Sequence, residues 1–179
     1  MNVKRVVTGR NDAGESVFLT ANSAPRTHDY AHIPGMSITQ LWSTTASPSL
    51  GSIKDPTENV VSIVPDVGGT QFMVVAFPPD RVMASPSFNG AAAAEENLRH
   101  APGLAERFEP DNPGMHTTDT IDYAVVLRGQ IWLELDGGRV EHLRAGDVVV
   151  QNGTRHAWRN RGDETALLAF VLIGAARKN

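Results

Sequence analysis

Short runs rich in apolar and β-branched residues follow one another along the second half of this chain, as they do in β-strands. Turn-forming pairs such as Gly137-Gly138 and Asn152-Gly153 separate the runs. The runs cover residues 121–127, 130–135, 140–143, 148–151, 155–159 and 166–173. Because short turns join antiparallel neighbours, the pattern predicts a series of hairpins. About eight short antiparallel strands are typical of an all-β jelly-roll barrel, or double-stranded β-helix, whose interior can hold a small ligand.

The first half of the chain contains fewer strand-like runs. Asn11 to Gly14 are turn formers that predict a further hairpin, and Pro78-Pro79 ends a strand because proline has no amide to donate to a ladder. Residues 25–34 contain prolines and polar residues and predict a loop. The strands predicted in this half cover residues 5–8, 16–20, 37–45 and 69–77.

Residues 87–108 have a different composition. Helix-favouring residues fill the stretch from Ala91 to Arg99, and Pro102-Gly103 then interrupts it. We expect one short helix and a helical turn, which form either an insertion over the mouth of the barrel or an element of its rim. The predicted organisation is a barrel over 66–174 with the insertion at 87–108, preceded by an N-terminal extension over 1–65 that packs on the barrel or on a dimer partner.

Size and composition narrow the range of functions. A chain of 179 residues can close one sizeable core. The net charge of −4, without a basic tract, indicates neither nucleic acid nor a membrane surface as a partner. No apolar run is long enough for a signal peptide or a membrane span, so we expect a cytoplasmic protein. The absence of cysteine removes disulfides and thiolate ligands. The expected partners are a small molecule and a second copy of the chain, because surplus N-terminal strands commonly pair with a neighbouring sheet edge.

Three chemically capable side chains lie at the two ends of the hairpin series. His116 and Asp122 stand at its start, and His156 lies close to its end. Because the hairpins double the chain back, we expect all three to reach one cavity. They are the candidate catalytic residues.

Four further residues are candidates for contact with substrate. Trp158 lies two residues after His156, so both face the same side of a strand. Trp158, Trp132 and Phe72 fit a cavity wall, and Thr118 could bond a substrate oxygen.

The spacing of these residues resembles the two sequence motifs of the cupin family. Thr118 stands where the first motif has its second histidine, and Asp122 stands where it has glutamate. Asn152-Gly153-Thr154 replaces Pro-x-Gly in the second motif, which is one residue shorter here. The resemblance covers residues 110–174 and implies a jelly-roll barrel that binds a small oxygenated organic molecule. The matching positions are His116, Asp122 and Gly129 in the first motif and Gly146, His156 and Asn160 in the second.

Two alternatives stay open for His116, Asp122 and His156. Imidazole and carboxylate groups suit divalent transition metals, so the three could hold one Zn, Fe, Mn or Ni ion. Aspartate is shorter than glutamate, however, and metal–ligand distances tolerate errors of only about 0.2 Å. In the other alternative the three side chains form a metal-free cluster that moves protons. A histidine with its usual pKa of about 6.5 would then be the acid or base, and Asp122 would fix its tautomer.

We therefore expect a lyase or isomerase that catalyses dehydration, decarboxylation or tautomerisation. The altered first motif should weaken iron binding, and the chain has no glycine-rich phosphate motif for a nucleotide cofactor. A noncatalytic metabolite-binding protein, a metal-dependent dioxygenase and a vestigial barrel are the alternatives. His28 and His32 are four residues apart, but no predicted helix aligns them as ligands.

Overall fold

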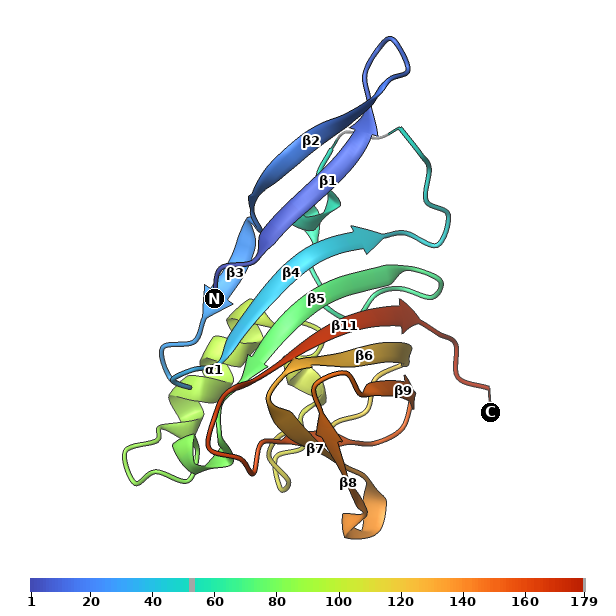
Figure 1. Cartoon of the computed structure of the whole chain (residues 1–179). Coiled ribbons are helices and arrows are strands. Elements are labelled where there is room, and N and C mark those ends of the chain that lie inside the picture. The colour runs from blue at the N-terminus through green and yellow to red at the C-terminus, as the bar shows by residue number, and fades with distance from the viewer. Residues whose placement is uncertain (52–53, 179) are drawn as a thin grey trace.

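Antiparallel sheets dominate the computed structural model, which describes residues 1–51 and 54–178 (Figure 1). The predicted extension over 1–65 is thus described except for residues 52 and 53. Within the described residues, the large sheet has the strand order β3 (Arg26–Asp29), β4 (Ser37–Thr44), β5 (Thr70–Phe77), β11 (Ala166–Gly174), β6 (Thr120–Arg128) and β9 (Val148–Asn152). The small sheet has the order β10 (Ala157–Arg159), β7 (Gln130–Glu134) and β8 (Val140–Arg144). A separate hairpin consists of β1 (Lys4–Arg10) and β2 (Ser16–Ser23).

The hydrophobic core lies between the large and the small sheet. Every second residue of β11 is buried, including Leu168 and Phe170, and β7 contributes Ile131 and Leu133 to the same cluster. This alternation buries one face of each strand and leaves the other toward solvent. The predicted all-β jelly-roll barrel is confirmed, and every strand predicted from the sequence is present.

One α-helix covers the side of the barrel. Helix α1 (Gly90–His100) begins where the Asn89 side chain accepts a hydrogen bond from the Ala92 amide at 3.1 Å. Ala93 and Ala101 join it to the core cluster. The predicted helix and helical turn are both present, because α1 is followed by a 3₁₀ turn at Ala105–Arg107. Further 3₁₀ turns lie at Pro56–Asn59, Asp80–Val82 and Asp136–Gly138.

Within residues 1–51 and 54–178, no helix could cross a membrane. None of their helices has both the length and the apolar character that a bilayer span requires.

The loop predicted over 25–34 is wrong in its first part. Arg26–Asp29 forms β3 and pairs with β4. These four residues show no alternation of burial, so their own sequence gives little strand signal. Their extended conformation therefore depends on backbone pairing with β4.

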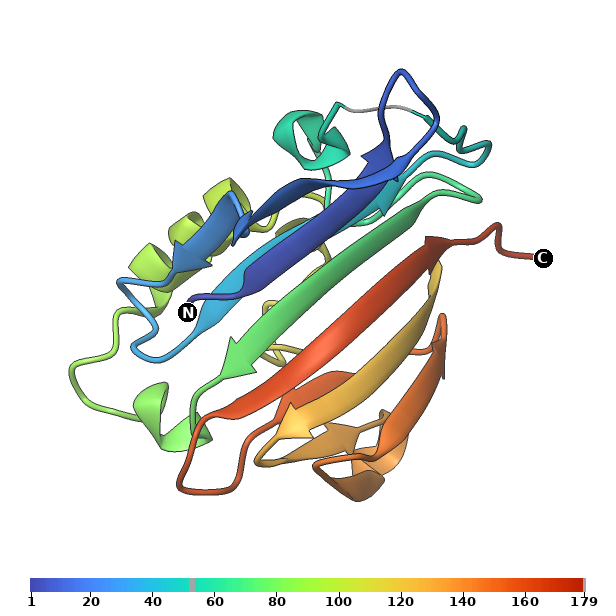
Figure 2. The same ribbon diagram turned by 45° about the horizontal axis from the view of Figure 1, so that its top comes forward.

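The N-terminal region is continuous with the barrel. β4 pairs with β5, so the large sheet crosses the boundary predicted at residue 65. The β1–β2 hairpin lies over the outer face of the large sheet, opposite α1 (Figure 2). Met1 and Val3 pack there with Leu41 and Val74.

Candidate functional site

His116 and His156 are joined through their backbones. Each amide donates to the other residue's carbonyl oxygen at 2.9 Å, which forms an antiparallel bridge between two distant segments. The centroids of their rings are 4.3 Å apart, and both residues line one cavity. The structure therefore brings the two predicted histidines together.

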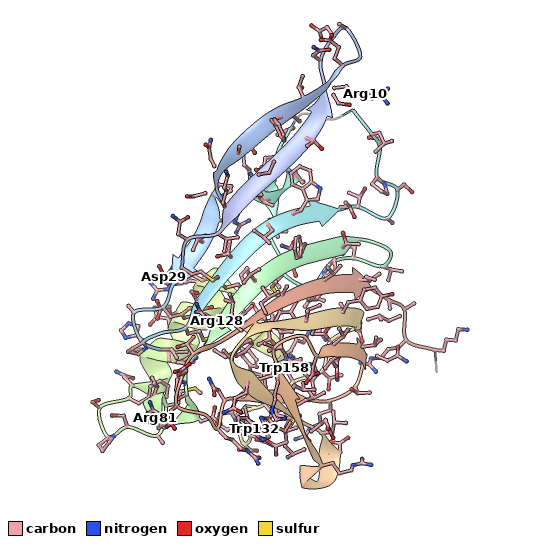
Figure 3. All side chains as sticks on the ribbon, in the orientation of Figure 1. Arg10, Asp29, Arg81, Arg128, Trp132 and Trp158 are labelled. Carbon is pink, nitrogen blue, oxygen red and sulfur yellow. The ribbon has the colours of Figure 1, made fainter. Side chains whose placement is uncertain are left out.

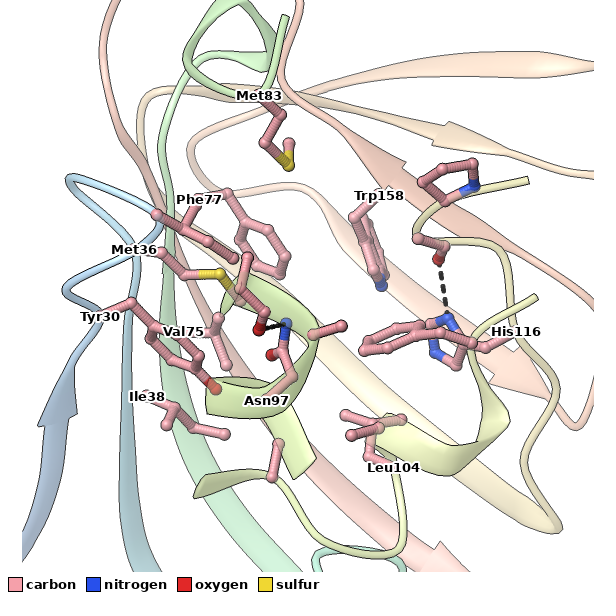
Figure 4. Close-up of a pocket in the computed structure, with 18 of the residues that line it drawn as sticks. Tyr30, Met36, Ile38, Val75, Phe77, Met83, Asn97, Leu104, His116 and Trp158 are labelled. Atoms are coloured by element: carbon pink, nitrogen blue, oxygen red, sulfur yellow. Dashed lines mark hydrogen bonds between the residues drawn. The ribbon is translucent and has the colours of Figure 1, made fainter. Parts of the chain in front are cut away.

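A backbone carbonyl fixes the tautomer of each histidine. Nδ1 of His116 lies 3.0 Å from the carbonyl oxygen of Gly114, and Nδ1 of His156 lies 3.0 Å from that of Thr154 (Figure 4 shows the first bond). Because a carbonyl oxygen can only accept, each Nδ1 carries the proton and each neutral ring has its lone pair on Nε2. The prediction that Asp122 fixes a histidine tautomer is wrong, since local carbonyls already occupy the Nδ1 positions.

Burial keeps both rings neutral. It lowers the pKa of His116, an effect that the Gly114 carbonyl and Glu109 partly oppose. Burial, together with the neighbouring His116, lowers the pKa of His156 to about 4. The expectation of a histidine pKa near its usual value is therefore wrong. Both imidazoles act as hydrogen-bond acceptors at neutral pH.

Asp122 is the acidic member of the site. It lies on β6, lines the same cavity and is 7% exposed. Its Oδ1 has no hydrogen-bond partner within the described part of the chain. Burial raises the pKa of Asp122 to about 6, and the Thr120 hydroxyl opposes part of this rise. A carboxyl group with such a pKa can both take up and release a proton near neutral pH.

Thr118 and Trp158 line the cavity beside these groups. The hydroxyl oxygen of Thr118 lies 2.8 Å from that of Thr120. The indole of Trp158 meets the His156 ring edge-on, with 6.0 Å between centroids. Contact of Thr118 and Trp158 with a substrate stays a prediction.

Phe72 and Trp132 do not form the predicted cavity wall. Phe72 faces outward and is 38% exposed, because the adjacent residues of β5 take the inner face. Trp132 lies opposite Arg159 in the small sheet and stacks on His142 with ring centroids 4.2 Å apart. Figure 3 labels Trp132 and Trp158 on these neighbouring strands. Strand register, which turns each side chain to one face or the other, decides this difference.

The cavity has a volume of about 660 Å³, within the range of sites for drug-sized ligands. Residues of the predicted loop and of α1 form the wall across from His116 (Figure 4). Sequence reasoning missed this wall. The sequence did contain a signal for this wall. Tyr30, Ile33 and Met36 are large apolar or aromatic residues in or directly after the predicted loop, where a solvent-exposed loop does not need them.

Two arginines hold the segment that precedes His116. The Arg155 guanidinium donates to both carboxylate oxygens of Glu109, at 2.6 Å each. Arg159 donates to the carbonyl oxygen of Pro113 at 2.6 Å and to Glu134 at 2.7 Å. These bonds hold the segment from Glu109 to Pro113 in place and so help to position His116 in the cavity lining.

His28 and His32 lie in another cluster, centred on Glu96 of α1. Nε2 of His28 lies 2.8 Å from the Glu96 carboxylate, and the His28 ring stacks on His100 with centroids 3.4 Å apart. The amides of Ala31 and His32 donate to the same carboxylate at 2.8 and 2.9 Å. This cluster attaches α1 to the segment after β3.

The fit of the site to a metal ion is incomplete. Two Nε2 lone pairs and the Asp122 carboxylate are suitable donors in kind. Among residues 1–51 and 54–178, however, no three histidine, aspartate or glutamate side chains stand close enough to share an ion. Metal binding by His116, Asp122 and His156 therefore stays a prediction.

Comparison with known families matches residues 106–173 to a family model described as Cupin domain. The matched segment contains His116, Asp122 and His156 but neither α1 nor β1 to β5. It therefore covers the polar end of the cavity and leaves out the wall formed by α1 and the residues after β3.

Comparison with curated proteins finds relatives in fungi. The chain is 60% identical over 62 residues to the phomopsin biosynthesis cluster protein C' of Diaporthe leptostromiformis, which covers 34% of this chain and 33% of that protein. The chain thus matches about a third of the length of that relative. It is 27% identical over 163 residues to a cupin-domain-containing oxidoreductase of Neurospora crassa, covering 88% of this chain and 66% of the relative.

Among solved structures, a Cupin 2 conserved barrel domain protein from Salinispora arenicola CNS-205 is 17% identical with a TM-score of 0.39. The match covers 78% of this chain and 76% of that chain.

Proposed function

We propose, from the match of residues 106–173 to the cupin-domain family model, that the chain transforms a small oxygenated organic molecule by moving a proton within the cavity. Asp122 is the acid and base, and His116 and His156 hold the substrate. The chemistry is that of an isomerase or lyase, with tautomerisation as the simplest case. The observation that carries this proposal is the position of Asp122, which is buried in the cavity lining beside His116 and His156 with an Oδ1 that has no hydrogen-bond partner among the described residues. This burial also raises the pKa of Asp122 to about 6.

The roles of the three side chains follow from their charge at neutral pH. Each neutral imidazole offers an Nε2 lone pair, which can accept a hydrogen bond from a substrate hydroxyl. The ionised Asp122 takes a proton from a carbon next to a carbonyl group, breaking the C–H bond. Protonated Asp122 then gives the same proton to the carbonyl oxygen, which forms the enol. The reaction balances without an oxidant or a nucleotide cofactor.

Hydrogen–deuterium exchange tests this proposal. The protein is incubated in D₂O with a panel of 4-hydroxyphenyl alkyl ketones, and mass spectrometry follows deuterium uptake next to the carbonyl. We expect catalysed exchange whose rate rises with pH through about 6, because the ionised form of Asp122 is the base. Asp122→Asn should slow it at least about 100-fold.

The matched control is Asp111→Asn, which changes an exposed aspartate outside the cavity. It should leave the exchange rate unchanged. Equal rates in wild type and Asp122→Asn would contradict the proposal. Binding of the ketones without exchange would favour the noncatalytic metabolite-binding protein instead.

Oxidation of a small molecule is the second candidate, because the Neurospora crassa relative is described as an oxidoreductase. A metal-dependent oxygenase would retain about one transition metal per chain after purification without an affinity tag. His116→Ala would release that metal, and the panel would show oxygen consumption in place of deuterium uptake. This pair of results would favour oxidation over proton transfer.

A further inference from the structure

Most of the polar groups that the cavity offers to a ligand are gathered at one end. His116, Asp122 and His156 lie there together with Thr118. The rest of the lining is largely apolar and includes Ile33, Met36, Ile38, Met73, Val75, Phe77, Met83, Phe88, Leu98, Leu104, Phe108 and Phe170.

Most polar residues elsewhere in the lining already bond within the protein. Asp80 accepts a hydrogen bond from the Asn160 amide at 2.9 Å, and the Asn160 side chain donates to two backbone carbonyls. The Asn97 side chain donates to the carbonyl oxygen of Ala93 at 3.2 Å, and Glu109 is paired with Arg155. These groups are engaged. The exception is the Tyr30 hydroxyl, which lies on the wall across from His116 and has no hydrogen-bond partner among the described residues. Most of the body of a ligand therefore meets an apolar surface.

The solvent-exposed part of the lining is also apolar. Met83 and Leu98 line the cavity, yet they are 41% and 48% exposed. Residues that border both the cavity and solvent mark where it opens. Pro110 and Pro113, just before His116, are also exposed lining residues. We call the part of the opening at Met83 and Leu98 the mouth. Figure 4 shows Met83 well away from His116. Both mouth residues lie outside the segment that matches the cupin family model.

We infer that the ligand is an amphipathic small molecule with one polar head and an elongated apolar tail. The head lies at His116, Asp122 and His156, and the tail runs through the apolar lining to the mouth. Met83 and Leu98 contact the end of the tail and determine which tail lengths bind well. This inference rests on the site of the proposed function, but binding alone tests it.

The preference for an elongated apolar tail is tested with the n-alkyl esters of 4-hydroxybenzoic acid, from methyl to dodecyl, whose affinities for the protein are compared. The phenol supplies a head that can donate to an imidazole Nε2, and the alkyl chain is the tail. Each buried methylene should lower the Kd about fourfold. The improvement should stop at the chain length that reaches the mouth. Titration calorimetry gives the Kd values.

Two variants test the mouth residues. Met83→Gln and Leu98→Asn replace an apolar side chain by a polar one of similar size. In wild type, the longest ester whose added methylene still lowers the Kd reaches the mouth. Each variant should raise the Kd of this ester about fivefold and leave the Kd of the methyl and ethyl esters unchanged. Leu127→Asn is the matched control, because Leu127 is also 48% exposed but lies outside the cavity lining. It should leave the whole series unchanged.

A Kd that is independent of chain length would overturn the inference, and so would the absence of binding by every ester. Equal weakening of short and long esters by Leu98→Asn would also overturn it, because the mouth would then act indirectly. Failure of the proposed function gives a different result. In that case Asp122→Asn would have no effect on deuterium exchange, while the dependence of Kd on chain length would persist.

Discussion

At the scale of single residues, Asp122 combines a catalytic potential with a cost to stability. A buried carboxylate oxygen that lacks a partner among the described residues disfavours the ionised form. The folded protein therefore binds the Asp122 proton more tightly than the unfolded chain does. Its stability falls as pH rises from the usual aspartate pKa of about 3.9 through about 6.

Asp122→Asn should make the protein more stable at neutral and higher pH. The amide cannot ionise, so the cost of the buried charge is removed, and we expect a gain of about 2 kcal/mol in the free energy of unfolding above pH ~7. The gain should disappear near pH ~4, where Asp122 is protonated in the folded wild type. Urea unfolding at both pH values measures it. Asp111→Asn should show neither effect, and a loss of stability in Asp122→Asn at neutral pH would contradict the prediction.

At the scale of secondary-structure elements, Glu96 holds α1 in place. Burial alone would raise the pKa of Glu96, but the hydrogen bonds from the Ala31 and His32 amides and from His28 outweigh it and lower the pKa to about 2. This stabilisation is present above the usual glutamate pKa of about 4.3 and is lost as pH falls toward 2. The bond network thus couples one wall of the cavity to the large sheet.

Glu96→Gln should loosen this attachment. The amide has a single acceptor oxygen and no charge, so we expect a loss of about 2 kcal/mol at neutral pH. The difference from wild type should shrink at acid pH. Glu95→Gln changes the exposed neighbour on the same helix and should stay within about 0.5 kcal/mol of wild type. Thermal unfolding measures both variants, and equal effects of the two would contradict the role of Glu96.

At the scale of the whole molecule, the outer face of the large sheet carries rows of apolar side chains. Phe72, Val171, Tyr123 and Val150 lie opposite one another across β5, β11, β6 and β9. Phe72, Tyr123 and Val150 are 38%, 48% and 63% exposed. A face of this kind favours pairing with the same face of a second copy. We propose that a homodimer forms through this face, whereas the sequence led us to expect that the N-terminal strands pair with a neighbouring sheet edge.

Val150→Asp should convert this dimer to a monomer. A carboxylate within this apolar contact would lose its hydration, so association should weaken at least about 100-fold. Size-exclusion chromatography with light scattering measures the mass of each species. Val61→Asp is the control, because Val61 is 86% exposed and lies in a loop. A wild-type protein that is already monomeric would rule out the dimer.

Much of the fold could be predicted from the sequence, because the signals for it are local. Runs of apolar and β-branched residues decide which residues form a strand, and glycines such as Gly129, with a φ of 78°, lie where the chain reverses. The helix in residues 87–108 was predictable from propensity and from the proline that follows it. The spacing of His116, Asp122 and His156 identified the polar end of the cavity.

By itself, then, the sequence determined the strands, the turns and the set of polar side chains at the site, since these depend on neighbours a few residues away. The tertiary structure decided that Arg26–Asp29 is a strand, that Trp158 faces inward while Trp132 faces outward, and that α1 forms a cavity wall. It also decided the protonation states of His156 and Asp122. Burial and strand register are properties of segments distant in the chain, and no local pattern contains them.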